Sequence, residues 1–257
     1  MNILIMGLLA GVLGMGIGAL LTLIFGTRTE KMISIFLAFA GGVMMSIALI
    51  ELIPEAIEYG GMFIAAIGLA IGIVMVLAFH SLIDAISSKG KKKEKLHGNY
   101  TEYFHASDIN KKSMLRSGFV MLFAIALHNI PEGLAMGAAG HHDVALGISL
   151  AILIGLHNIP EGMAVSAPLI SGGLTKGKVL CLTLLAGATT AIGTAFGILF
   201  GGISDVTLAL SFAIAGGAML YVVLGEILPQ VIVIRKDRTP ILFLFLGILL
   251  GMLFTAI

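Results

Sequence analysis

The sequence predicts an all-α polytopic membrane protein with eight transmembrane helices in a 3+2+3 inverted-repeat arrangement. The observations behind this prediction are the composition, the lengths of the apolar segments and a set of internal repeats. Of the 257 residues, 58% are hydrophobic and 11% are charged, whereas charged residues make up about a quarter of a soluble domain. Lipid contact must replace the missing polar surface, so we expect a single transmembrane domain over residues 1–257.

The apolar segments have the length that a membrane crossing requires. A helix that spans the hydrocarbon core of a bilayer needs about 20 mostly apolar residues. The 34 glycines of the chain suit helices that pack closely in a membrane. The predicted spans are residues 4–25, 33–53, 62–83, 115–139, 144–170, 179–200, 206–228 and 239–256. The long polar segment 84–114 is expected to be a cytoplasmic loop.

The basic residues predict the orientation of these spans. All 15 Lys and Arg residues lie in or at the edge of four alternate inter-span segments, 26–32, 84–114, 171–178 and 229–238. Short loops rich in Lys and Arg face the cytoplasm. We therefore expect a multi-pass protein of the cell (inner) membrane with both termini outside.

Three pairs of segments repeat along the chain. Residues 40–54 (AGGVMMSIALIELIP) resemble residues 215–229 (AGGAMLYVVLGEILP), which relates the second and seventh spans. The tetrapeptide LLAG occurs at 8–11 and 184–187, in the first and sixth spans. The members of each pair stand five positions apart in the order of the spans. Because five is odd and successive spans alternate in direction, the two triplets must cross the membrane in opposite directions. Inverted repeats of this kind are typical of secondary transporters.

The third repeat carries the polar groups. The hexapeptide HNIPEG stands at 128–133 and again at 157–162, inside the fourth and fifth spans. In each copy the His and the Glu are four positions apart and the Asn and the Glu are three apart, so these side chains share one face of a helix. Ionisable residues at membrane depth mark ion paths, proton relays or metal sites. The candidate metal ligands are His128, Asn129, Glu132, His157, Asn158 and Glu161.

The ligand chemistry favours a transition metal. Imidazole and carboxylate together suit zinc, iron and other first-row divalent ions, and two glutamates balance a 2+ charge. Pro131 and Pro160 cannot donate a backbone hydrogen bond, so each span is expected to be kinked beside its glutamate. Cys181 is the one cysteine of the chain, which excludes a cage built from cysteines.

Other readings of the same residues remain open at this point. Histidine and glutamate can carry protons in a proton-coupled transporter of another solute, and polar pairs can simply join helices. A membrane-embedded metalloenzyme is a further alternative, but the predicted spans contain neither the Glu-x-x-His nor the His-Glu-x-x-His motif of such enzymes. The sequence contains no basic patch with interleaved aromatic residues, the pattern that would indicate nucleic-acid binding. We therefore expect a transporter and not an enzyme.

The doubled HNxPEG motif and the eight-span layout resemble the bacterial branch of the ZIP family of divalent-metal transporters. The resemblance covers essentially the whole chain. It implies uptake of zinc into the cytoplasm, with iron, manganese, cobalt or cadmium as alternative cargo and no prosthetic group. It also implies a homodimer and a binuclear metal centre at mid-membrane on the fourth and fifth spans, with help from the sixth.

One departure from the family pattern stands in the sixth span. Family members of this branch often carry a glutamate there in a G-x-x-E-x-x-G pattern, which reads GATTAIG at 187–193 with Thr190 at the glutamate position. We therefore expect one strong metal position and one weak or absent one.

Several other polar residues allow two interpretations each. Each of them could guide the ion, or could simply lie at the membrane interface or in an exposed turn. Glu51 and Glu55 are expected at an outer entrance, and His80, Asp84 and Glu226 at an inner exit. The histidines His141 and His142 are expected in the short outer loop between the two motif helices.

Overall fold

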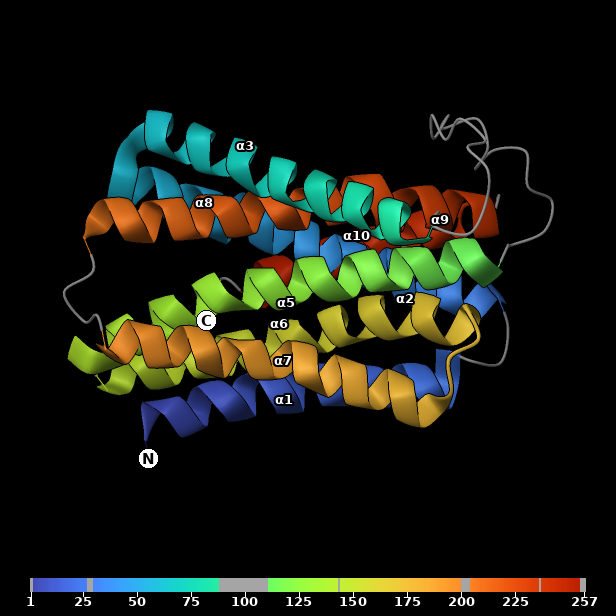
Figure 1. The fold of residues 1–257 in the computed structure, drawn as a ribbon, viewed down its shortest axis with the longest axis horizontal. Helices are drawn as coiled ribbons and strands as arrows, with labels where there is room; N and C mark the ends of the chain where they lie inside the picture. The colour runs from blue at the N-terminus through green and yellow to red at the C-terminus, as the bar shows by residue number, and fades with distance from the viewer. Residues whose placement is uncertain are drawn as a thin grey trace.

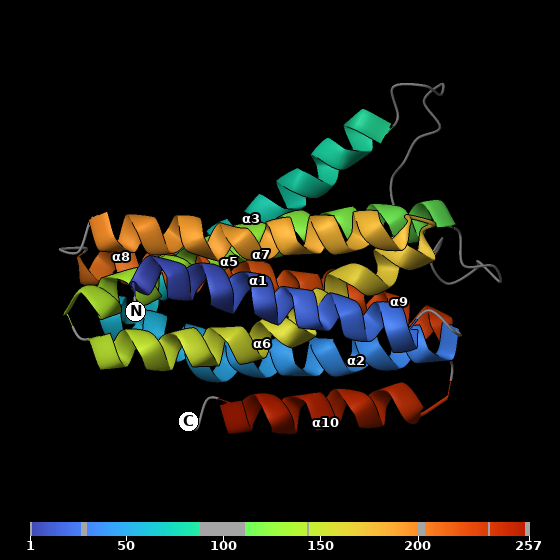
Figure 2. The same ribbon diagram turned by 90° about the horizontal axis from the view of Figure 1, so that it is seen from below.

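The structure is a computed structural model, and it describes residues 2–26, 30–87, 111–142, 144–199, 204–235 and 237–254. The elements of these ranges are helices, with no strand among them, which confirms the all-α prediction. Most of them run along one common direction (Figure 1), whereas α3 tilts away from the other helices (Figure 2). In chain order the elements are α1 (Ile3–Leu21), π-helix η1 (Thr22–Gly26), α2 (Glu30–Ile47), π-helix η2 (Ala48–Leu52), α3 (Ile53–Ser87), α5 (Lys111–His142), α6 (Val144–Ser171), α7 (Lys176–Leu199), α8 (Asp205–Tyr221), π-helix η3 (Val222–Ile227), α9 (Leu228–Ile234) and α10 (Thr239–Phe254).

The chain is a multi-pass membrane protein. Six helical segments of the described residues are long and apolar enough to cross a bilayer: Ile3–Phe25, Lys31–Leu82, Lys111–Gly140, Gly147–Ser171, Lys176–Leu199 and Asp205–Ile234. Helix α10 is apolar but shorter. Its side chains Leu242, Phe245 and Leu253 are more than half exposed, as expected of a helix whose outer face contacts lipid.

The second and third predicted spans are joined differently from the prediction. A loop was expected over 54–61, but the helix of α2 continues through η2 into α3, and the whole helical segment Lys31–Leu82 has 52 residues. Its backbone leaves the helical conformation at Gly61, where φ is +74°. Figure 1 shows the chain reversing its direction near the start of α3. Glycine adopts a positive φ without steric cost, so the helix can turn back here without a loop.

The other predicted loops also differ from the prediction. Helix α3 runs to Ser87 and α5 starts at Lys111, so both ends of the predicted loop 84–114 are helical, and 88–110 lie outside the described residues. His141 and His142 form the last turn of α5 rather than a loop, because α6 begins two residues later at Val144. The connection between the motif helices is therefore shorter than expected.

The helices form two bundles. Helices α1, α5, α6 and α7 pack mainly against one another and form the first bundle; α2, α3, α8 and α10 form the second. Figure 1 shows α1, α6 and α7 on one side and α3 and α8 on the other. The bundles meet chiefly where α2 contacts α6 and where α5 contacts α8.

Glycines set the distance between helices inside each bundle. A Cβ atom placed on Gly11 of α1 would lie 2.0 Å from the carbonyl oxygen of Gly187 of α7. A Cβ on Gly193 of α7 would lie 2.0 Å from the carbonyl oxygen of Ile130 of α5. The same holds in the second bundle, where Gly42 of α2 faces the carbonyl of Leu244 of α10 at 2.1 Å. Backbones in such contact gain dispersion energy, which drives helix association in lipid.

The two similar segments 40–54 and 215–229 also share an unusual backbone feature. Each segment contains a π-helix, η2 in the first and η3 in the second, at matching positions. The repeated glutamates, Glu51 and Glu226, lie within these two π-helices. A π-helical turn is rare and frequently occurs at functional sites. The two segments are thus similar both in sequence and in local backbone conformation.

We expect Gly193→Ala to destabilise the protein because its methyl group would push α7 away from the carbonyl of Ile130. Overpacking of this kind costs about 1–3 kcal/mol, which thermal unfolding in detergent would detect as a lower Tm. Gly177→Ala on the same helix is the matched control, since a Cβ there has no neighbour within 4 Å. An equal Tm for both variants would contradict the close approach of α5 and α7.

Candidate metal centre

The two HNIPEG copies face each other in the middle of the first bundle. Helix α5 carries the first copy and α6 the second, and the two helices pack together. All six predicted ligands are buried, with at most 3% of any residue exposed. Both helices contain their prolines without interruption of the helix, and Figure 2 shows α6 bending part-way along its length.

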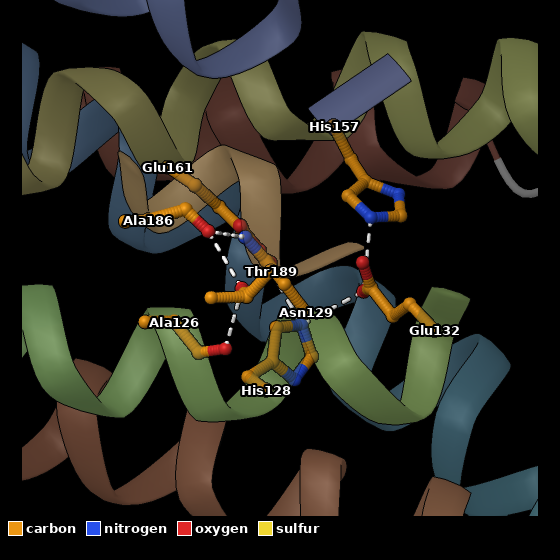
Figure 3. A network of polar contacts seen from close by, with 8 residues as sticks. All are labelled: Ala126, His128, Asn129, Glu132, His157, Glu161, Ala186 and Thr189. Atoms are coloured by element: carbon orange, nitrogen blue, oxygen red, sulfur yellow. Dashed lines mark hydrogen bonds and ion pairs between the residues drawn. The ribbon is translucent and has the colours of Figure 1, made fainter. Parts of the chain in front are cut away.

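Four of the six side chains converge on one point. The Nε2 atom of His128 lies 2.8 Å from Oε1 of Glu132 and 3.4 Å from Oε1 of Glu161. His157 reaches the same Glu132 oxygen from α6, at 2.9 Å. Figure 3 shows His157 and Glu132 pointing toward each other across the two helices. Among the described residues, His128, Glu132 and Glu161 form a group whose ligand atoms all lie within 4.8 Å of one another.

The atoms of this cluster lie close enough together for one cation to contact several of them. Although they approach so closely, the ring nitrogens of His128 and His157 and the oxygens of Glu132 and Glu161 have no hydrogen-bond partner among the described residues. Each of these nitrogen–oxygen contacts is an ion pair when the imidazole carries its second proton, and offers ligand atoms to a cation when it does not. Two ligands held about 2.1 Å from one zinc ion lie roughly 3.0–3.4 Å apart. The separations in the cluster fall close to this range.

The two asparagines have different surroundings. Asn129 donates its amide hydrogen to the carbonyl of Ala186 on α7, at 3.2 Å, and its Oδ1 atom has no partner among the described residues. Neither side-chain amide atom of Asn158 has a partner in the described part of the chain. Both asparagines therefore keep a side-chain oxygen without a partner among the described residues.

Thr189 and two carbonyls complete the network on α7. The Thr189 hydroxyl lies 2.7 Å from the carbonyl oxygen of Ala126 and 2.6 Å from that of Ala186 (Figure 3). The Ala186 oxygen thus accepts from Thr189 and from Asn129, which ties α5 to α7 beside the cluster. The sequence does not indicate these carbonyls, because backbone atoms carry no residue-specific pattern.

Comparison with known proteins agrees with this site. Residues 90–257 match the family described as ZIP Zinc transporter. A protein of Akkermansia muciniphila named Zinc transporter ZupT is 33% identical, and the match covers all of this chain and 97% of that protein. The chain belongs to the ZIP zinc transporter family. It is therefore a transporter of a divalent-metal family and not an enzyme.

Further ZIP relatives match over most of their length. The Zinc transporter ZupT of Chlorobaculum parvum is 35% identical over 86% of this chain and 84% of the relative. That of Campylobacter jejuni is 33% identical over 83% of this chain and 81% of the relative. The resemblance inferred from the doubled motif is thus confirmed.

The ZIP position in α7 that often holds a glutamate has a threonine directed elsewhere. Thr190 is fully buried, and a Cβ placed on Gly11 of α1 would lie 2.7 Å from its Oγ1 atom. The Thr190 hydroxyl therefore faces α1, whereas its neighbour Thr189 lies in the network beside Asn129. Neither threonine supplies a negative charge.

The other polar residues singled out in the sequence lie in two parts of the molecule. Glu51 in η2 is half-buried, has an unpartnered Oε2 atom and interacts electrostatically with His157 and Glu132 of the cluster. Glu55 lies one turn further along, also half-buried. His80 and Glu226 contact each other away from the cluster. The side chains of Asp84, His141 and His142 lie outside the described part of the structure.

We expect zinc to raise the Tm of the purified, chelator-treated protein, because a ligand that binds only the folded state stabilises it by about 2.7 kcal/mol at a hundred times its Kd. Glu132→Gln should remove most of this shift, since Glu132 contacts both histidines of the cluster. Glu58→Gln, at an exposed position, should keep it. A full zinc-induced shift in Glu132→Gln would contradict a metal-holding role for the cluster.

Proposed function

We propose that this ZIP family protein carries divalent transition-metal ions, zinc foremost, across the membrane into the cytoplasm. The observation that supports it best is the convergence of His128, Glu132, His157 and Glu161, which meet in a buried cluster at nitrogen–oxygen distances of 2.8–3.4 Å. The relatives with matching sequences carry the name Zinc transporter ZupT.

The charges of the cluster fit a divalent cargo. Two carboxylates balance a 2+ ion, so the loaded site carries no net charge in an apolar surrounding where charge is costly. Two imidazole nitrogens favour zinc, iron, cobalt and manganese over magnesium or calcium. Zinc is our first choice, with iron, manganese, cobalt and cadmium as alternatives.

We propose one well-liganded ion and a weaker second position. The second ion would use the free oxygens of Asn129 and Asn158 with the remaining carboxylate oxygens. With Thr190 in place of a glutamate, that position lacks the anionic ligand that α7 often supplies in the family. An ion there would bind less tightly than the one at the histidines.

We propose eight membrane crossings in a 3+2+3 inverted repeat. The reversal at Gly61 divides Lys31–Leu82 into two crossings, and α10 supplies the last. The helix contacts support the internal symmetry: α1 packs on α6 as α7 packs on α5, and α2 packs on α10 as α8 packs on α3. The contact of α2 with α6 likewise has its counterpart in α8 with α5.

We further propose that both termini face outward in the cell (inner) membrane. The support is the distribution of the 15 basic residues, which all fall in or beside loops of one side. Uptake from outside then delivers the ion to the cytoplasm. The homodimer implied by the family resemblance stays a prediction.

Zinc uptake into vesicles that contain the purified protein tests the function. We expect His157→Ala and Glu132→Ala to lower the uptake rate by about tenfold or more, as ligand-shell changes commonly do. Glu58→Gln is the control for a glutamate outside the cluster. Unchanged uptake of zinc, iron and manganese in both cluster variants would refute the proposed role of the site.

Labelling of single cysteines in intact cells tests the orientation. In a Cys181→Ala background, we expect Ser204→Cys to react with an impermeant maleimide from outside and Asp237→Cys to react only after the membrane is opened. Both positions are exposed, at opposite ends of the segment Asp205–Ile234. The reverse pattern would place the termini inside.

A further inference from the structure

One hydroxyl on α7 contacts two carbonyl groups beside the central cluster. The Oγ1 atom of Thr189 lies 2.7 Å from the carbonyl oxygen of Ala126 on α5 and 2.6 Å from that of Ala186 on its own helix (Figure 3). The second contact joins residues three positions apart, so the hydroxyl binds a carbonyl one turn earlier on α7. Thr189 thus links α7 to α5 and holds the Ala186 carbonyl at the junction of the two helices.

The Ala186 carbonyl decides the orientation of an amide on α5. Asn129 donates from Nδ2 to this oxygen at 3.2 Å. A carbonyl oxygen only accepts hydrogen bonds, so the NH₂ group of Asn129 must face it and Oδ1 must point the other way. This Oδ1 atom has no hydrogen-bond partner among the described residues, although Asn129 is fully buried. Because buried amide oxygens are normally paired, this oxygen is a candidate ligand for a cation.

The second motif copy lacks this arrangement. Asn158 has the same place in its hexapeptide, yet neither its amide oxygen nor its amide nitrogen has a partner in the described part of the chain. Helix α1 packs on α6 as α7 packs on α5, and the LLAG segments at 8–11 and 184–187 align Leu13 with Thr189. Leu13 has no hydroxyl and is 55% exposed. Two identical hexapeptides therefore differ because of the helix that packs on each.

We propose that Thr189 is a positioning residue that keeps Oδ1 of Asn129 directed to the transported ion. The role rests on the proposed transport function, in which both asparagines supply oxygens to the weaker ion position. Thr189 holds the Ala186 carbonyl, and that carbonyl holds the Asn129 amide. An oxygen that is fixed before the ion arrives binds it with a smaller loss of conformational freedom. Asn158 has no such support, so the ion itself must orient its amide.

A hydroxyl that only joined α5 to α7 would have a different effect. Its loss would loosen the helix pair and weaken zinc binding by the same factor whether or not Asn129 is present. A positioning role makes the loss depend on Asn129, because Thr189 then acts through that amide. The two roles therefore separate in a double-mutant comparison.

The test measures zinc binding by the full chain in lipid nanodiscs after treatment with a chelator. We expect Thr189→Val to weaken the weaker zinc-binding step by about tenfold or more, as the loss of an outer contact commonly does. Thr189→Ser keeps the hydroxyl and should bind zinc like the wild type. In an Asn129→Ala background Thr189→Val should have no further effect, whereas in an Asn158→Ala background it should have its full effect.

Thr183→Val is the matched control on the same helix. Thr183 is fully buried, and its hydroxyl contacts that of Ser166 on α6 and donates to the carbonyl of Val179. The control thus removes a buried, hydrogen-bonded hydroxyl, but roughly 9 Å further along α7 at 1.5 Å per residue. Its zinc affinity should equal that of the wild type. Thr189→Ala replaces Thr189→Val if the latter fails to fold, because the smaller side chain leaves more room beside the two carbonyls.

Several results would overturn the role of Thr189. One is zinc binding by Thr189→Val equal to that of the wild type, and another is wild-type zinc binding that Asn129→Ala does not weaken. A loss that Thr189→Ser does not restore, or that Thr183→Val reproduces, would indicate general packing instead. So would a loss of the same size in the Asn129→Ala background, and a loss that depends on Asn158 would contradict the assigned partner.

Glu132→Gln keeps the proposed function separate from this role. If Glu132→Gln binds zinc as tightly as the wild type, the central cluster is not the metal centre and the proposed function fails. If Glu132→Gln abolishes zinc binding while Thr189→Val leaves it unchanged, the role of Thr189 alone is refuted.

Discussion

The structure depends on the cost of keeping two histidines and two glutamates inside apolar helices. One charged side chain at the centre of a membrane helix costs about 2.5–3.5 kcal/mol by insertion measurements. His128, Glu132, His157 and Glu161 meet this cost together, because each lies near an opposite or complementary group. The arrangement requires α5 and α6 to stay in register, and α1 and α7 to cover them.

The packing around the site shows how that register is held. Inside the first bundle, glycines bring backbones into contact at Gly11 with Gly187 and at Gly193 with Ile130. Between the bundles, the described glycines make no such backbone contact, and side chains of α2, α5, α6 and α8 fill the space. A methyl group is therefore tolerated much less inside a bundle than at the boundary between bundles. The cluster of histidines and glutamates lies in the less tolerant part.

Much of the centre was predictable because its information is local. The i, i+4 spacing of His128 and Glu132, repeated at 157–162, fixes which side chains share a helix face, and a buried antiparallel pair brings the two faces together. The direction of Thr190 was not predictable from the motif pattern, since it depends on how α7 is rotated against α1. The buried hydrogen bond between Gln230 and Ser117 was also not predictable, because it forms only where α9 brings Gln230 to α5. The reversal between the second and third spans was predicted, but its form was not: a proline, two glutamates and two glycines in 53–61 indicate a loop, whereas the helix continues to Gly61.

The matching π-helices η2 and η3 have a consequence for the history of the chain. A π-helical turn holds one residue more than the α-helical turn it replaces, so it marks a single-residue insertion. The insertion stands at equivalent positions of two segments that also share a glutamate and a proline. If the two triplets descend from one duplicated unit, the extra residue was already present in that ancestor before it doubled. Each copy then kept the same bulge while its glutamate acquired different neighbours, the central cluster in one half and His80 with Ser117 in the other.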